Sequence, residues 1–145
     1  MGINLKNKMV NLSATLGLVF SFCIVFLLVI IMLYPYKLVD YNYDKFKIIT
    51  PVVKAGSEVI FESEFYKNTD LGAMVERQLI NSNIYYYSAV PANNPTGYNK
   101  RLITLVIPEY VEPGIYYVKS TIRYKVNFLR EVVYVKDTEE FEVIK

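Results

Sequence analysis

Paired carboxylates are the feature of this sequence that could most readily do chemistry. Glu62 and Glu64 occupy alternate positions in one stretch, and Glu140 and Glu142 do so in another. Two carboxylates on one face can serve in acid–base hydrolysis. On an alternating strand, however, such residues more often form the solvated face. We therefore expect no catalytic residues and predict that the chain is not an enzyme.

Metal sites and activated nucleophiles are limited by the residue types present. The chain has no histidine, and its one cysteine, Cys23, lies inside a long apolar run. Zinc ligand sets and Ser–His or Cys–His pairs therefore cannot be assembled. Asp40, Asn42 and Asp44 have the spacing of the first ligands of a calcium loop, but Lys45 replaces the glycine that its turn requires. We expect no metal and no cofactor.

The charge of the chain argues against a nucleic-acid partner. Its formal net charge is only +2, and no cluster of basic residues is larger than the pair Lys100 and Arg101. Nucleic-acid-binding domains usually carry a basic patch or stripe. A single cysteine also means that no disulfide forms within the chain, so its core is held by packing.

An uncharged segment extends over residues 9–36. The hydrocarbon core of a bilayer needs about 20 apolar residues in a helix, and residues 12–34 supply them. A cleaved signal peptide has a shorter apolar region, about 7–15 residues, with small residues after it, whereas bulky and polar residues come next here. We predict an uncleaved transmembrane signal-anchor helix over residues 11–36, after a short basic tail over residues 1–10.

Counting basic residues alone does not decide the orientation of this anchor. Two lysines precede the segment and three come after it: Lys6, Lys8, Lys37, Lys45 and Lys47. A short basic tail before an N-terminal apolar segment is the usual arrangement for export of the domain on its C-terminal side. We expect a cytoplasmic N-terminus and an extracytoplasmic, periplasmic or extracellular, C-terminal domain.

Small residues recur every four positions in the anchor, at Ser13, Gly17 and Ser21. This spacing puts them on one helix face, where they would let two helices approach closely. Self-association into a homo-oligomer through this face is one hypothesis, and a plain anchor is the other. Four tyrosines at the end of the segment could lie at the headgroup level: Tyr34, Tyr36, Tyr41 and Tyr43.

Strand patterns dominate from Phe46 onward. Val59, Phe61 and Phe65 alternate with glutamates, as expected of a half-buried strand. Residues 114–126 alternate in the same way, with apolar positions at Tyr116, Val118, Ile122, Tyr124 and Val126. Residues 101–107 are apolar on both faces, which predicts a central strand.

Turn signals separate these strands, and no helical pattern intervenes. We predict an all-β fold over residues 46–145, an antiparallel sandwich of about seven strands, joined to the anchor by a juxtamembrane connector over residues 37–45.

Two stretches give this sandwich a resemblance to known modules. Residues 52–65, VVKAGSEVIFESEF, resemble the first two strands of immunoglobulin-like domains, and VEPGIYY resembles the start of the sixth strand in fibronectin type III domains. The resemblance implies a tyrosine corner of Val111, Pro113 and Tyr116, with the Tyr116 hydroxyl bonded to backbone upstream. The chain lacks tryptophan and a cysteine pair, so the broader sandwich class is implied.

The layout of basic tail, anchor and cysteine-free sandwich is also similar to that of small membrane proteins of tailed phages. This resemblance implies a bacterial-type membrane. The anchor and the sandwich together suggest two functional classes. One is a non-enzymatic binding or interaction module whose partners are the lipid bilayer and an unknown protein or envelope component. The other is a phage-encoded membrane subunit for lysis regulation or superinfection exclusion, which oligomerises through its helix.

A candidate binding edge lies in the stretch IYYYSAVPANNPTGYN. It combines a long polar loop with Tyr85, Tyr86, Tyr87 and Tyr98. Tyrosine supplies a large, adaptable contact area at low entropic cost. Alternate strand positions point inward, however, so ordinary packing is the competing interpretation of these rings.

Overall fold

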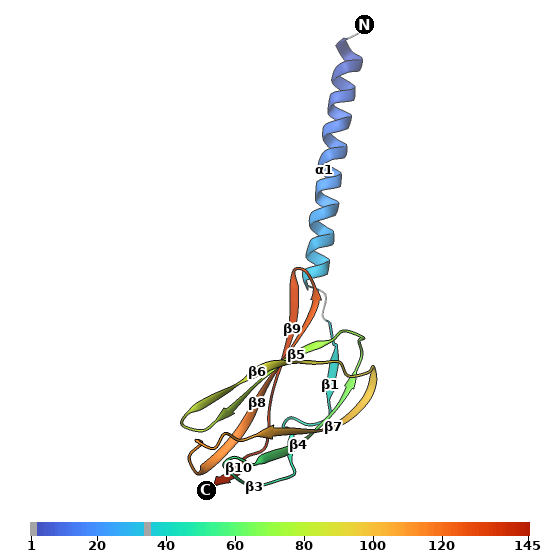
Figure 1. The fold of residues 1–145 in the computed structure, drawn as a ribbon. Helices are drawn as coiled ribbons and strands as arrows, with labels where there is room; N and C mark the ends of the chain where they lie inside the picture. Colours follow the sequence, from blue (N-terminus) through green and yellow to red (C-terminus); the bar gives the residue numbers. More distant parts are fainter. Residues whose placement is uncertain (1–2, 34–35) are drawn as a thin grey trace. The chain divides into compact units, whose positions relative to one another are not determined.

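The computed structural model describes residues 3–33 and 36–145 (Figure 1). Side chains are described from Thr15 onward within these ranges. The chain divides into two compact units, Met1–Tyr36 and Lys37–Lys145. All buried apolar side chains of the described residues belong to the second unit, from Leu38 to Val143. The second unit therefore has a core of its own.

The first unit is a single α-helix, α1 (Ile3–Leu33). It begins earlier than the predicted anchor, because no proline or glycine occurs between Gly2 and Gly17 and the helix continues through the basic tail. Within it, Thr15–Leu33 is long and apolar enough to cross a membrane, and none of this stretch is buried. At 1.5 Å per residue this stretch is about 28 Å long, close to the thickness of a hydrocarbon core.

The second unit contains two sheets, and β4 (Glu58–Lys67) is the centre of the first. It pairs along its whole length with β7 (Gly97–Val106). Its other side pairs with two short strands, β1 (Val39–Tyr41) and β2 (Lys47–Ile48). Alternate residues of β4 are buried, as its sequence predicts, and turn toward the second sheet.

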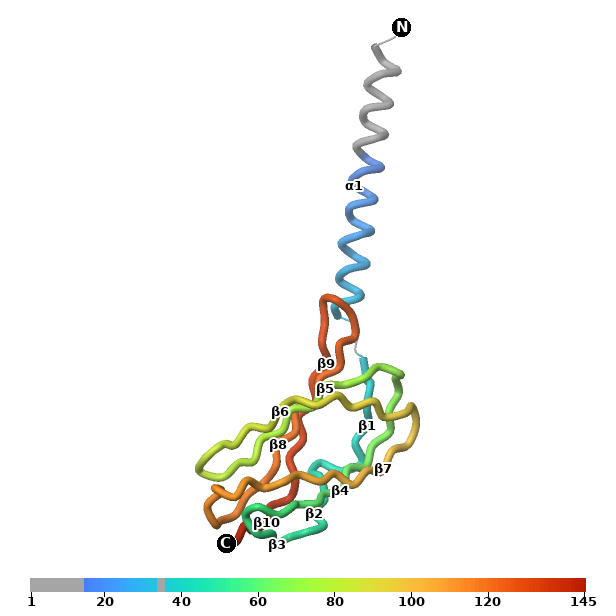
Figure 2. The backbone as a smooth tube through the Cα atoms, viewed as in Figure 1, coloured from blue at the N-terminus to red at the C-terminus, as the bar shows by residue number. Residues whose placement is uncertain are grey.

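The second sheet is built on β8 (Gly114–Asn127), the longest strand. One side of β8 pairs with β5 (Ala73–Ile80), which in turn pairs with β6 (Ile84–Ala92). The other side of β8 pairs with two strands. Its C-terminal part pairs with β9 (Arg130–Asp137), and its N-terminal end pairs with β10 (Phe141–Ile144). The short strand β3 (Val52–Lys54) adds to β10 in parallel. Figure 2 traces β4 and β7 in one sheet and β5, β6 and β8 in the other.

This arrangement is an all-β, immunoglobulin-like sandwich preceded by one apolar helix, as predicted. Ten strands lie in the described residues instead of about seven, because the short segments before β4 are strands too. Pro51 separates β2 from β3, and the chain there passes from the first sheet to the second. Proline has no N–H to donate to a sheet ladder, which explains the break.

One predicted boundary and one predicted strand position differ from the structure. The connector predicted over residues 37–45 contains β1, whose Val39 pairs with Lys67, so the sandwich begins within it. A strand does cover most of residues 101–107, but its predicted central position is wrong, since β7 pairs only with β4 among the described strands. Its outward apolar residues, Leu102 and Val106, are exposed.

Candidate functional site

A cavity of about 410 Å³ lies between the two sheets, in the part of the sandwich where they do not close on each other. Residues of β4 and β7 line it from one sheet, and residues of β5 and β8 line it from the other. The connection from β6 to β7 contributes Asn93 and Asn94. Farther along the same strands the sheets close on Phe61, Leu79 and Val118, which are fully buried.

An arginine and a serine face this cavity from the second sheet. Arg77 of β5 and Ser120 of β8 are directly paired in the ladder, and both line the cavity. The Nε of Arg77 and the Oγ of Ser120 are buried, and neither has a hydrogen-bond partner. Burial lowers the pKa of the Arg77 guanidinium, because a charged group is less stable away from water.

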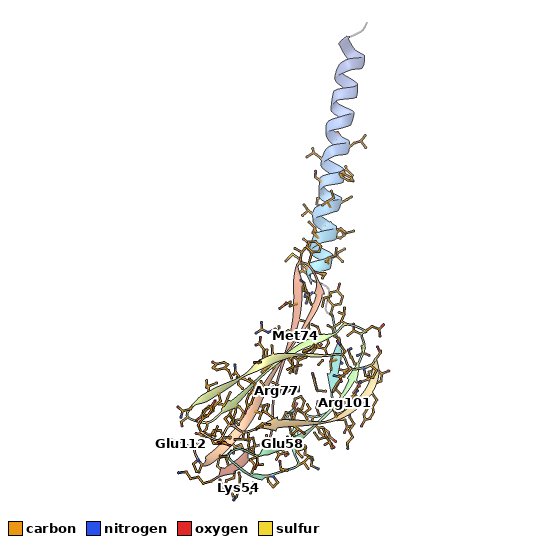
Figure 3. All side chains as sticks on the ribbon, viewed as in Figure 1. Lys54, Glu58, Met74, Arg77, Arg101 and Glu112 are labelled. Carbon is orange, nitrogen blue, oxygen red and sulfur yellow. The ribbon has the colours of Figure 1, made fainter. Side chains whose placement is uncertain are left out.

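A second arginine–serine pair faces the cavity from the first sheet. Arg101 of β7 is directly opposite Ser63 of β4, and both line the cavity. Ser63 is 2% exposed, whereas Arg101 is exposed at the open side. Figure 3 labels Arg77 and Arg101 on the two sides of the space between the sheets.

The charges around the cavity are unbalanced. No acidic residue is among the described residues that line it. None of the ion pairs in the described part of the chain involves Arg77 or Arg101. Lys67, two positions beyond Phe65 on the inner face of β4, is 1% exposed, and its Nζ donates to the carbonyl oxygen of Asn94 at 2.6 Å. That bond ties the loop at the cavity to β4.

Apolar and aromatic side chains line the rest of the cavity. Val75 and Ile122 lie two positions from the Arg77–Ser120 pair and are paired with each other. Phe65 is in the corresponding position on β4, two residues after Ser63. The next inward pair, Ala73 and Tyr124, completes this wall together with Tyr41 of β1. The cavity thus has two levels along the strands. One level carries the arginine and serine side chains, and the other, beside it, is apolar.

The structure separates the four tyrosines of the predicted binding edge. Tyr85 lies against the rings of Tyr110 and Tyr116, with centroids 5.9 and 6.4 Å away. The Tyr87 hydroxyl donates to the carbonyl oxygen of Val106 at 2.9 Å, which links the edges of the two sheets. Of Tyr85, Tyr86 and Tyr87, only Tyr86 is largely exposed, at 73%, while Tyr98 is 59% exposed.

Tyr98, the fourth tyrosine of the predicted edge, belongs to β7 in the other sheet, where it is paired with Tyr66. It hydrogen-bonds to the Glu64 side chain on the outer face. The four rings therefore form no common surface, because β6 and β7 belong to different sheets.

The Tyr116 hydroxyl donates to the carbonyl oxygen of Glu112 at 2.9 Å. This is the upstream backbone bond that the resemblance to fibronectin type III domains implies. Tyr116 and Val111 are 2% and 3% exposed, while Pro113 is exposed in the turn before β8. This bond ties the first residues of β8 to the connection that precedes it.

The acidic residues considered from the sequence lie apart from the cavity. Glu62 forms an ion pair with Lys100, 3.1 Å apart. Hydrogen bonds from Tyr98 and from Asn42 lower the pKa of the Glu64 carboxyl. Glu140 and Glu142 are exposed.

In the calcium-like stretch, Asp40 pairs with Lys37 at 2.7 Å and the amide of Asn42 donates to Glu64. In the described part of the chain, no three His, Cys, Asp or Glu side chains come together to hold a metal.

The residues proposed for the anchor have mixed outcomes. Tyr34 and the side chain of Ser13 lie outside the described residues, while Gly17 and Ser21 are exposed on α1. Tyr43 is 50% exposed, and Tyr36 is partly buried.

The headgroup prediction is contradicted for Tyr41. Its ring packs in the sandwich against Phe46, Phe65 and Tyr134 at 5.5–5.9 Å. Burial raises the pKa of its hydroxyl, and Tyr124 and Tyr134 add smaller contributions.

Arg77 and Ser120 were not among the residues selected from the sequence, although a signal was present. In AMVERQLI the inward positions are Ala73, Val75, Arg77 and Leu79, so one charge interrupts an apolar face. In β8, Ser120 interrupts the inward series in the same way. A polar residue at an inward position was therefore visible, but which strands pair was not.

No protein-family model matches this chain, and no curated protein matches it. Among solved structures, the chain is similar to the CARDB domain of the PF1109 protein from Pyrococcus furiosus, in complex with di-metal ions, at 16% identity and a TM-score of 0.41. That alignment covers 75% of this chain and 96% of the other.

Two further solved structures are similar at the same level. A Niemann-Pick type C2 protein from the Japanese carpenter ant has 8% identity and a TM-score of 0.40, over 75% of this chain and all of that one. The Pseudomonas fluorescens alkylpurine DNA glycosylase AlkC, bound to DNA with an abasic site analog, has 12% identity and a TM-score of 0.41. The chain spans 30% of that enzyme, and 74% of this chain is aligned. These distant similarities carry no argument about what this chain binds or does.

Proposed function

We propose that this protein is a single-pass, membrane-anchored, non-enzymatic binding module. In this proposal α1 spans a bacterial-type membrane with its N-terminus in the cytoplasm, and the sandwich lies on the extracytoplasmic side. The observation that carries the anchor is the surface of Thr15–Leu33, where large apolar side chains such as Leu18 and Phe22 are 73% and 72% exposed. Such a surface is stable in lipid and costly in water.

The cavity between the sheets supports the binding part of the proposal. A sandwich held only by packing would close its two apolar faces on each other, as this one does around Phe61. The cavity instead contains cations and hydroxyl groups. Its described lining holds donors without a carboxylate or imidazole that could act as a general base. This chemistry supports recognition of a ligand more than its conversion.

The β8–β9 hairpin supports a position close to the membrane surface. Its tip carries Phe128 and Leu129, which are 81% and 42% exposed. The backbone N–H of Leu38 donates to the Tyr134 hydroxyl at 3.0 Å, and the Lys136 amine donates to the carbonyl oxygen of Tyr43 at 3.2 Å.

The stretch that starts the domain therefore runs beside β9 in the same direction. The hairpin tip, which precedes β9, lies at the end of the second unit where its first residues, Lys37 and Leu38, begin. We propose that Phe128 and Leu129 enter the headgroup region there.

The alternative class, a phage-encoded membrane subunit that oligomerises through α1, remains a prediction from the sequence. Gly17 has no atom within 4 Å of where a Cβ would lie, so its face is open. Crosslinking of the full chain in membranes tests this class. Loss of a crosslinked dimer in Gly17→Leu would favour the oligomer, and a monomer in both forms would leave the plain anchor.

Alkaline carbonate extraction of membranes tests the anchor itself. The full chain is expected to stay with the membrane pellet, while residues 37–145 expressed alone are expected in the supernatant. Extraction of the full chain into the supernatant would contradict the proposal, because a spanning helix is not removed by carbonate.

A further inference from the structure

We infer that the cavity between the two sheets binds a small amphiphilic anion, one that carries a carboxylate or phosphate group next to an apolar part. This inference rests on the proposed binding function and gives the chemical class of its ligand. It is drawn from two arginine–serine pairs that face each other across one cavity, Arg77–Ser120 and Ser63–Arg101, together with the apolar wall beside them.

The positive charge of the cavity favours an anionic ligand. Arg77 is half-buried, and neither an ion pair nor a hydrogen bond to its Nε occurs in the described residues. A partly buried cation without a counter-charge has lost part of its hydration, and an oxyanion offsets that loss. The planar guanidinium matches the two oxygens of a carboxylate or phosphate. Arg101 lines the same cavity from the other sheet, so both sheets offer positive charge to one ligand.

The serines add neutral donors at the same level. The Oγ of Ser120 has no partner in a residue that is 1% exposed. Buried hydroxyl groups in native proteins are nearly always paired. A ligand oxygen in the cavity would accept from this hydroxyl, and Ser63 lies opposite on the inner face of β4. The Ser120 hydroxyl and the neighbouring Arg77 Nε both lack a hydrogen-bond partner. An oxygen-bearing group of a ligand would accept a hydrogen bond from each.

The apolar wall of the cavity, next to the arginine and serine side chains, favours a ligand that also has an apolar part. Val75, Ile122 and Phe65 line the cavity two positions from the arginine–serine level. An inorganic anion would leave this wall in contact with water. A volume of about 410 Å³ is within the range of small-molecule sites, about 300–1,000 Å³. A ring or a short acyl chain attached to the anionic group would therefore use both levels of the cavity.

Binding of water-soluble probes to the full chain tests this inference. The chain is placed in phosphatidylcholine nanodiscs, and affinities are measured calorimetrically for phenyl phosphate, phenylacetate, neutral phenylacetamide and inorganic phosphate. Phenyl phosphate and phenylacetate are expected to bind. Phenylacetamide is expected to bind at least about tenfold more weakly, since it leaves the partly buried cation unpaired. Inorganic phosphate is expected to bind more weakly than phenyl phosphate.

Three single-charge variants locate the site. Arg77→Gln and Arg101→Gln are each expected to weaken phenyl phosphate binding by about tenfold. Arg123→Gln is the matched control, because Arg123 lies on the outer face of β8, paired with Glu76 at 3.2 Å, and affinity should not change. Arg101 is exposed, so its variant is expected to fold even if Arg77→Gln does not. Thermal unfolding of each variant checks folding.

Equal affinity for phenylacetamide and phenylacetate would overturn the inference, as would unchanged affinity in Arg101→Gln and Arg77→Gln. Binding of phenylacetamide alone would overturn the anionic class but leave the binding module standing. Failure of the chain to reside in membranes would overturn the anchor without touching the cavity.

Nanodiscs that contain phosphatidic acid identify the source of the anion. Displacement of phenyl phosphate by this lipid supports the inference with a lipid headgroup as the ligand. Undiminished binding supports it with a soluble small molecule as the ligand.

Discussion

Arg77 of β5 and Ser120 of β8 are direct neighbours in the sheet ladder, and each has a buried polar atom with no hydrogen-bond partner. The next inward-facing pairs along the same two strands are apolar, as at Val75 and Ile122 or at Leu79 and Val118. The sandwich thus places polarity at one level of an otherwise apolar face. That polarity is not used by the fold itself, and we connect it with the cavity that both residues line.

The hydroxyl of Ser120 is expected to contribute nothing favourable to stability. Because its Oγ has no partner, Ser120→Ala should leave the free energy of unfolding unchanged or raise it by up to about 1 kcal/mol. Urea denaturation of the domain Lys37–Lys145, which has its own core, measures this change.

Thr138 provides the matched control for this measurement. It is equally buried, accepts from the backbone N–H of Val118 at 2.9 Å and donates to the carbonyl oxygen of Glu139 at 2.7 Å. Thr138→Val should lower the free energy of unfolding by about 1–3 kcal/mol, since it leaves buried partners unpaired. A loss in Ser120→Ala as large as that in Thr138→Val would show that the serine hydroxyl is paired.

The Tyr116 hydroxyl is expected to stabilise the turn before β8. Tyr116→Phe keeps the buried ring but removes the bond to Glu112, so the free energy of unfolding should fall by about 0.5–1.5 kcal/mol. Tyr86→Phe is the control, because Tyr86 is 73% exposed and its variant should unfold like the native chain. Equal stability of the two variants would contradict a structural role for the corner.

The domain is expected to lose stability as the pH rises above 10.0. Burial, with a smaller effect of Tyr110, raises the pKa of Tyr87 from 10.0 to about 12, and burial also raises the pKa of Tyr41 and Tyr124. The unfolded chain therefore releases these protons first, and between pH 10.0 and about 12 stability falls with increasing pH.

Urea unfolding at stepped pH, with tyrosinate absorbance as a second readout, measures this loss. Tyr87→Phe removes one of the groups, so its stability should fall less steeply over that interval. Identical slopes for the native domain and Tyr87→Phe would show that Tyr87 ionises alike in both states.

The tip of the β8–β9 hairpin is expected to contact lipid. Phe128→Trp in the full chain should fluoresce at shorter wavelength in nanodiscs than a water-exposed tryptophan does, and brominated lipids should quench it. Leu102→Trp is the control, because Leu102 is 65% exposed on the outer face of β7. Unquenched emission from both positions would contradict the proposed contact.

Much of the fold could be predicted from alternation in the sequence. Val59, Phe61 and Phe65 are buried as their spacing predicts, since a strand has only two faces and one of them must be apolar to pack. The break at Pro51 and the edge position of β7 could not be predicted. They depend on which strands pair, and pairing is a long-range property that a local pattern does not contain.

The candidate site was harder to predict for the same reason. Tyr85 and Tyr98 are close in sequence but belong to different sheets, whereas Arg77 and Ser120 are 43 positions apart by their numbering and are direct neighbours. The sequence shows that polar residues interrupt the apolar inner face of each of these strands. Only the register of β5 against β8, and of β4 against β7, places these residues around one cavity.

Protease protection of a C-terminal epitope tag tests the central claim, display of the sandwich outside the cytoplasm, most directly. The full chain is expressed in bacterial cells, and protease is added to intact cells, to spheroplasts and to detergent-treated membranes, with a cytoplasmic protein as the control. The proposal predicts that the tag is cleaved in spheroplasts while the cytoplasmic control stays intact. A tag that survives until detergent dissolves the membrane would place the sandwich in the cytoplasm and contradict the proposed function.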